Sequence, residues 1–221
     1  TQLQGELGPL DVGTVTDAGE LQLLLEAFRN ADHHVADEAL SGAVERAGVI
    51  SPERARDVLE ADNLALLPGL VNAHAHASMT LLRGVAEDVP VESWFNDIVW
   101  RMETNLTPED AYWGAKLAAL EMLEAGVTCV ADHYLHMEAV APAFAEAGLR
   151  AHLAPTMFGA DPDGELGRAR AFAEAWHGHD AGRIRAWLGP HSPYLCSGDF
   201  LKRVRAEADA LEVGVHLHVS E

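Results

Sequence analysis

The sequence is poor in cysteine and in basic residues. Two cysteines among 221 residues cannot form the disulfide framework of a small secreted domain, so we expect a reducing compartment, namely the cytoplasm. The sequence has 15 Lys and Arg and 35 Asp and Glu, which gives a formal net charge of −20. Because nucleic-acid binding depends on basic side chains that neutralise phosphates, this charge argues against a nucleic-acid partner.

Long apolar runs are also absent. The chain is 48% hydrophobic, but no stretch approaches the roughly 20 uninterrupted apolar residues that a membrane helix needs. We therefore expect no membrane partner. A chain of this length can bury about 70% of its extended surface, which is enough for a core without disulfides.

From residue 64 onward, short apolar runs alternate with amphipathic helical patterns, which is typical of βα units around a parallel sheet. Thr107 and Pro108 form a helix start, and Gly126 marks the end of that helix. The pattern predicts five strands, over 70–76, 127–132, 149–155, 184–190 and 213–219, and four helices, over 108–125, 137–148, 164–176 and 199–212.

Residues 1–60 differ from the rest. Their pattern predicts helices over 20–31 and 36–47, a further helix start at Ser51 and Pro52, and a short strand over 58–61. We therefore divide the chain into a helical N-terminal extension, 1–60, and a barrel portion, 61–221.

Two pairs of histidines lie at the ends of predicted strands. His74 and His76 follow the first apolar run, and His216 and His218 lie in the last. Residues i and i+2 of a strand point to the same face, so each pair could converge on one ion, and neutral imidazoles suit Zn²⁺ or Fe²⁺. The alternative is that such histidines only pack, and we expect one of His216 and His218 to be a hydrogen-bonded core residue.

Four colinear motifs resemble the amidohydrolase superfamily, and most closely its methylthioadenosine/S-adenosylhomocysteine deaminases with the related triazine and guanine aminohydrolases. The motifs are Pro68 to His76 (PGLVNAHAH), Met79 to Gly84 (MTLLRG), Gly189 to Tyr194 (GPHSPY) and His218 with Glu221. The resemblance implies an α/β fold, the metal-dependent (β/α)₈ TIM-barrel hydrolase, of which this chain carries about five strands.

The resemblance also implies a reaction and its residues. One divalent ion, zinc first with iron or manganese as alternatives, would activate water to deaminate a purine nucleoside derivative: methylthioadenosine, S-adenosylhomocysteine or adenosine. His74, His76 and His218 match metal ligands, and Glu221 matches the catalytic carboxylate that shuttles the proton. His216 matches no ligand.

Two further positions match substrate-binding residues of the same branch. Glu103 aligns with a carboxylate that binds ribose hydroxyls, and His191 ends the fourth predicted strand, where it could hydrogen-bond the substrate. The alternatives are an ordinary charge near a helix end for Glu103 and a structural cap in a proline turn for His191.

The sequence departs from the family pattern in several ways. No arginine follows the third strand to hold a substrate tail, because Arg168 and Arg170 are out of register. A barrel closes with eight strands, and the family takes further metal ligands from its sixth and eighth. Two alternatives stay open: hydrolysis of another amino- or halo-substituted heterocycle, such as guanine or a triazine, and a non-catalytic fragment that needs a partner to complete the barrel. We expect a small-molecule substrate and either a homo-oligomer or the C-terminal barrel half as partner.

Overall fold

The computed structural model describes residues 67–220 of the chain. The helices and the strand expected between residues 20 and 61 lie outside these residues, as does Glu221. The division at residue 60 stays a prediction.

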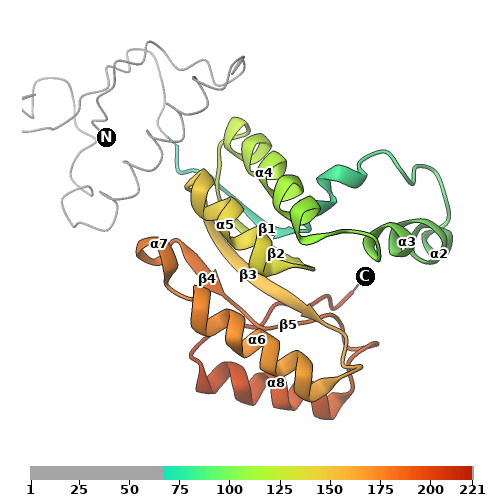
Figure 1. Cartoon of the computed structure of the whole chain (residues 1–221), viewed down its shortest axis with the longest axis vertical. Helices are drawn as coiled ribbons and strands as arrows, with labels where there is room; N and C mark the ends of the chain where they lie inside the picture. The colour runs from blue at the N-terminus through green and yellow to red at the C-terminus, as the bar shows by residue number, and fades with distance from the viewer. Residues whose placement is uncertain (1–66, 221) are drawn as a thin grey trace, which may run out of the picture. The chain divides into compact units, whose positions relative to one another are not determined.

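Parallel strands form the centre of the described part (Figure 1). Neighbouring strands follow the chain, in the order β1 (Leu70–Ala75), β2 (Val127–Tyr134), β3 (Arg150–Met157) and β4 (Ile184–Ala186). The short β5 (Gly189–Pro190) pairs with the end of β3. Every pairing is parallel, so the carboxyl ends of the strands meet at one edge of the sheet.

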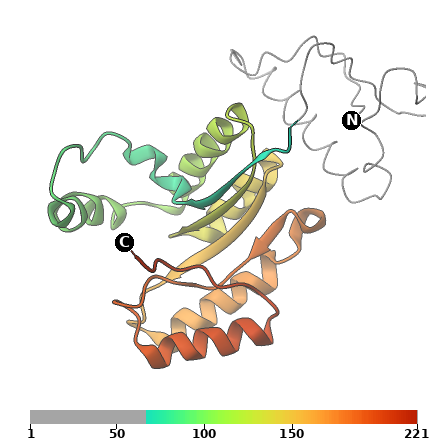
Figure 2. The same cartoon turned by 180° about the vertical axis from the view of Figure 1, so that it is seen from behind.

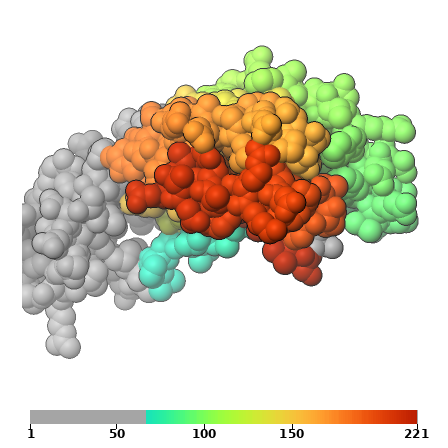
Figure 3. All heavy atoms as spheres, turned by 90° about the horizontal axis from the view of Figure 1, so that it is seen from below, coloured from blue at the N-terminus to red at the C-terminus, as the bar shows by residue number. Residues whose placement is uncertain are grey.

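Each crossover between neighbouring strands runs through a helix, which confirms the expected βα order (Figures 1 and 2). The connecting helices are α4 (Pro108–Glu124), α5 (Met137–Ala147) and α6 (Pro162–Trp176), with the short α7 (His179–Gly182) before β4. After β5 comes α8 (Gly198–Ala210), which lies beside α6 (Figure 3). Ion pairs join these two helices, including Arg170 with Glu207 at 2.6 Å.

Local sequence signals explain where the helices begin and end. Thr107 accepts a hydrogen bond from the Asp110 backbone N–H, and the Asp110 carboxylate accepts one from the Thr107 N–H, so a capping box opens α4. Gly148 ends α5 in the left-handed conformation, with φ of 79°. The hydroxyl of Ser197 accepts from the Phe200 N–H and begins α8.

The segment between β1 and α4 carries structure that the sequence did not predict. A 3-10 helix (Ala77–Leu82) follows β1, and α2 (Val91–Ser93), a π-helical turn (Trp94–Val99) and α3 (Trp100–Glu103) follow it. The 3-10 helix packs very closely on α4, since a Cβ at Gly114 would lie 2.5 Å from the Ser78 carbonyl oxygen. Glycine at this position allows the backbone of Ser78 to contact α4. This contact holds the residues directly after His76 against the helix.

Two of the five expected strands were wrong in detail. The run expected over 184–190 divides into β4 and β5, because a strand break at Trp187 and Leu188 separates their pairings with β3. Residues 213–219 form no regular strand and contribute one bridge, between Val215 and Leu188. Their backbone still runs parallel to residues 188–191, because the N–H groups of His216 and His218 donate to the carbonyls of Leu188 and His191.

Apolar side chains fill the space between sheet and helices. The helix α5 is buried along most of its length, and a second cluster joins β3 to α8 through Met157, Leu188, Phe200 and Val204. Among the described residues, no helix combines the length and apolar character needed to cross a membrane.

Candidate metal centre and substrate pocket

Three imidazoles converge at the carboxyl edge of the sheet. His74 and His76 come from the end of β1, and His218 comes from the segment that follows α8. Their Nε2 atoms lie 3.3 Å apart for His74 and His76, 3.2 Å for His74 and His218, and 3.3 Å for His76 and His218. The structure thus brings together the three residues that the sequence singled out as ligands; that they bind a metal stays a prediction.

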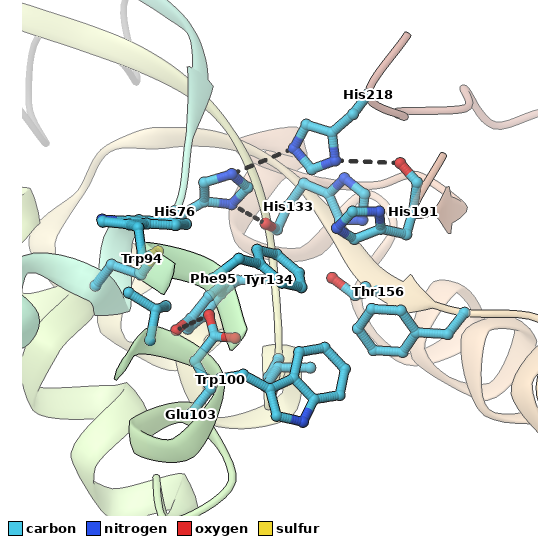
Figure 4. Close-up of a pocket in the computed structure, with 14 residues that line it drawn as sticks. His76, Trp94, Phe95, Trp100, Glu103, His133, Tyr134, Thr156, His191 and His218 are labelled. Carbon is cyan, nitrogen blue, oxygen red and sulfur yellow. Dashed lines mark hydrogen bonds between the residues drawn. The ribbon is translucent and has the colours of Figure 1, made fainter. Parts of the chain in front are cut away.

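The outer ring nitrogens show how two of these imidazoles are oriented (Figure 4). His76 Nδ1 lies 2.5 Å from the carbonyl oxygen of His133, and His218 Nδ1 lies 3.1 Å from that of His191. A carbonyl only accepts, so each Nδ1 carries a hydrogen, and in the neutral form of either ring the lone pair is on Nε2. Two lone pairs therefore face each other at 3.3 Å, an arrangement that a cation between them would stabilise.

The spacing fits a divalent ion. A tetrahedral zinc ion with nitrogen ligands at roughly 2.0–2.1 Å holds those nitrogens about 3.3 Å apart. Burial lowers the pKa of His76 to about 4 against the hydrogen bond to the His133 carbonyl, and the nearby imidazoles add smaller contributions that also lower it. This ring is neutral at physiological pH, which is the form that binds metals.

The backbone around these ligands is tied to β2. The buried carboxylate of Asp132 accepts a hydrogen bond from the Ala77 N–H at 2.8 Å, directly after His76. Its second oxygen has no hydrogen-bond partner within residues 67–220. Burial raises the pKa of Asp132 to about 7, against the hydrogen bonds from the backbone of Ala77 and His133.

A pocket with aromatic walls is lined by two of the three imidazoles, those of His76 and His218 (Figure 4). The π-helical turn and α3 cover one side and the ends of β2 and β3 the other, and neither Lys nor Arg is among the described residues that line it. Its walls include Trp94, Phe95, Trp100, Tyr134 and Phe158. Flat apolar walls with a few polar groups suit an aromatic heterocycle.

Glu103, the last residue of α3, lines this pocket; that it binds substrate stays a prediction. Its Oε1 accepts the Tyr134 hydroxyl at 2.8 Å. Burial raises the pKa of Glu103 while the hydrogen bond from Tyr134 lowers it, and burial together with the Glu103 charge raises the pKa of Tyr134. Tyr134 therefore stays protonated and holds the carboxylate in place.

His191 also lines the pocket. It is 8% exposed, and its ring stacks on Phe158 with a centroid distance of 5.3 Å. The same ring lies 4.7 Å from that of His218, between the three imidazoles and the pocket wall. The structure thus places Glu103 and His191 in one cavity, although they are distant in the sequence.

Other predicted residues have different surroundings. Glu221 lies outside the described residues. Arg168 pairs with Asp161 and Arg170 with Glu207, so neither arginine is a pocket residue. His216 contacts His74: the distance from His74 Nδ1 to His216 Nε2 is 2.9 Å.

Sequence reasoning missed His133. Its side chain is 1% exposed, lines the pocket and stacks on His218 with a centroid distance of 5.1 Å. Neither of its ring nitrogens has a hydrogen-bond partner within the described part. The available signal was its place in Asp132-His133-Tyr134, where an apolar strand ends and side chains face the mouth of a barrel.

Residues 65–221 match the model of the amidohydrolase family. The chain belongs to the amidohydrolase family. This membership confirms the expected α/β fold, in which part of a TIM barrel is present.

The chain is similar to amidohydrolases named 5-methylthioadenosine/S-adenosylhomocysteine deaminase. That of Desulforudis audaxviator is 46% identical over 169 residues, which are 76% of this chain and 39% of the relative. That of Moorella thermoacetica is 42% identical over 189 residues, which are 85% of this chain and 44% of the relative. This chain thus spans less than half the length of these relatives.

Solved structures of the family are similar in fold. A zinc-bound adenosine deaminase from Xanthomonas campestris has a TM-score of 0.65 and 36% identity, over 68% of this chain and 36% of that chain. A zinc-bound atrazine chlorohydrolase from Arthrobacter aurescens has a TM-score of 0.63 over 69% of this chain and 40% of its own. At 22% identity, the second likeness shows the fold alone.

Proposed function

We propose that this chain carries the metal-binding part of an aminohydrolase active site that deaminates a purine nucleoside derivative. One observation carries the proposal: three imidazole nitrogens are spaced for a divalent ion, and two of these imidazoles line an aromatic pocket that contains a carboxylate. The names of the similar proteins support it, because they are deaminases of adenosine and its thioether derivatives.

His74, His76 and His218 would hold the ion, and zinc fits their nitrogen donors best. When bound there, the ion supplies Lewis acidity that lowers the pKa of water towards neutrality. The protein groups perform the remaining tasks of binding, orientation and proton transfer.

The purine would bind between the aromatic walls, with its amino-bearing carbon towards the imidazoles. Glu103 would accept hydrogen bonds from the two ribose hydroxyls, held for that purpose by Tyr134. His191 would hydrogen-bond a ring nitrogen of the substrate. Together these contacts would fix the reacting carbon in place, which is a major source of rate enhancement.

Glu221 would act as general acid and base. Its carboxylate would take a proton from water as the oxygen adds to the ring carbon, and deliver it to the ring nitrogen. The remaining proton, on the new hydroxyl, then passes to the amino group, which leaves as ammonia, and the ring keeps a carbonyl. This role rests on the spacing of Glu221 from His218 in the sequence.

The lining of the pocket favours substrates without a charged tail. Since no cation lines it among the described residues, we propose that adenosine and methylthioadenosine are better substrates than S-adenosylhomocysteine, whose tail carries a carboxylate.

The test is ammonia release by the full-length gene product, loaded with zinc, on adenosine, methylthioadenosine, S-adenosylhomocysteine, guanine and a chlorotriazine. We expect turnover of the two nucleosides without a charged tail, its loss with a chelator and its return with zinc. Stoichiometric zinc without deamination of any purine would contradict the proposal. Turnover of the chlorotriazine alone would favour the alternative function, hydrolysis of another substituted heterocycle.

A further inference from the structure

The three predicted ligands differ in what their outer ring nitrogens contact. Those of His76 and His218 lie against backbone carbonyls, at 2.5 and 3.1 Å. That of His74 lies 2.9 Å from another imidazole, His216 Nε2. The two rings are nearly perpendicular, at 87°, and these two nitrogens lie within hydrogen-bond distance.

An imidazole nitrogen can donate or accept, whereas a carbonyl can only accept. If His74 directs its Nε2 lone pair at a cation, its hydrogen is on Nδ1, and His216 Nε2 must then accept that hydrogen. The opposite tautomer would put a hydrogen on His74 Nε2, which lies 3.2–3.3 Å from the Nε2 atoms of the other two ligands, and would block the cation.

The surroundings of His216 hold it in position. Its backbone N–H donates to the Leu188 carbonyl, and the Leu188 N–H donates to the Gly214 carbonyl, both at 2.9 Å. The Trp187 ring stands perpendicular to that of His216 at a centroid distance of 6.0 Å. A Cβ at Gly214 would lie 2.7 Å from the Trp187 indole, so glycine at this position allows the indole to pack closely on the backbone.

We propose that His216 is a positioning residue for the metal centre: its Nε2 accepts the Nδ1 hydrogen of His74 and so fixes the tautomer and the orientation of that ligand. This role rests on the proposed metal site. Ligating histidines commonly donate their second N–H to such an outer partner, whose removal weakens metal binding by about 10- to 100-fold.

The experiment measures zinc affinity of the metal-stripped full-length gene product by competition with a chromophoric chelator. His216→Phe keeps a ring but removes the acceptor, and we expect about 10- to 100-fold weaker zinc binding. His216→Gln keeps an acceptor near the Nε2 position and should restore most of the affinity.

His152→Phe is the matched control. His152 also packs on Trp187, at a centroid distance of 4.5 Å, but it is not in the ligand cluster. We expect this variant to bind zinc like the unsubstituted protein. Circular dichroism of the metal-free proteins checks that each variant folds; if His216→Phe does not, the comparison of His216→Gln with a His216→Ala variant decides.

Equal zinc affinity in the unsubstituted protein and the variants without the acceptor would overturn the role of His216, while the proposed function would stand. An equal loss in His152→Phe would overturn it too, because the effect would then come from packing on Trp187. An unsubstituted protein that binds no zinc would remove both this role and the metal site of the proposed function.

Discussion

Replacing Glu103 by glutamine tests how the pocket recognises its substrate. The carboxylate is half-buried, lines the cavity and accepts a hydrogen bond from the Tyr134 hydroxyl at 2.8 Å. A hydrogen bond to a charged group contributes about 1.5–3 kcal/mol. Glutamine keeps one acceptor but loses the charge, so we expect kcat/KM for adenosine to fall roughly 10- to 100-fold.

The assay compares adenosine with 2′,3′-dideoxyadenosine, which lacks both ribose hydroxyls. If Glu103 binds those hydroxyls, Glu103→Gln should lower kcat/KM for adenosine and leave that for the dideoxy substrate nearly unchanged. Glu146→Gln is the matched control, because Glu146 accepts a tyrosine hydroxyl from Tyr112 at 2.7 Å on the exterior. An equal loss on both substrates would refute the reasoning, since the carboxylate would then act on the pocket as a whole.

Three further predictions concern stability, measured by urea unfolding. Gly114→Ala should lower the free energy of unfolding by about 1–3 kcal/mol, because the new Cβ would meet the Ser78 backbone, whereas Gly167→Ala, with nothing within 4 Å, should not destabilise. Asp132→Ala should cost about 1–3 kcal/mol, because the buried N–H of residue 77 loses its acceptor; an unchanged midpoint would contradict this. Hydrogen bonds at the N-terminus of α4 hold the pKa of Asp110 below its usual value. Its stabilisation is therefore complete above the usual aspartate pKa of about 3.9 and is lost as pH falls through the lowered folded value, so Asp110→Ala should destabilise at neutral pH and have little effect at strongly acidic pH.

Local signals were sufficient for most helices and strands. Thr107 and Asp110 form a capping box around Pro108 at the first helical position, all within four residues, so α4 could be placed from the sequence. The strands β1, β2 and β3 are largely apolar runs in a parallel sheet, and their positions were predicted closely. Where pairing depends on distant residues, as in 184–190 and 213–219, the sequence predicted continuous strands and the structure divides or reduces them.

In the site, too, local patterns predicted some features, whereas others depend on contacts between distant residues. The period of two along a strand placed His74 and His76 on one face, and the family resemblance selected His218, Glu103 and His191. The contacts of Glu103 with Tyr134 and of His74 with His216 join segments 31 and 142 residues apart, which no local pattern encodes. The sequence did not single out His133 as a pocket residue, because a single histidine in an apolar strand has no periodic signal.

The sequence by itself determined the family and the parallel α/β architecture, because these depend on short motifs and on hydrophobic periodicity. Only the tertiary structure decided which nitrogen of each histidine faces its neighbours. That choice depends on acceptors supplied by other strands: the carbonyls of His133 and His191 and the ring of His216. Hydrogen bonds of this kind are directional and form only after the sheet has brought the strand ends together.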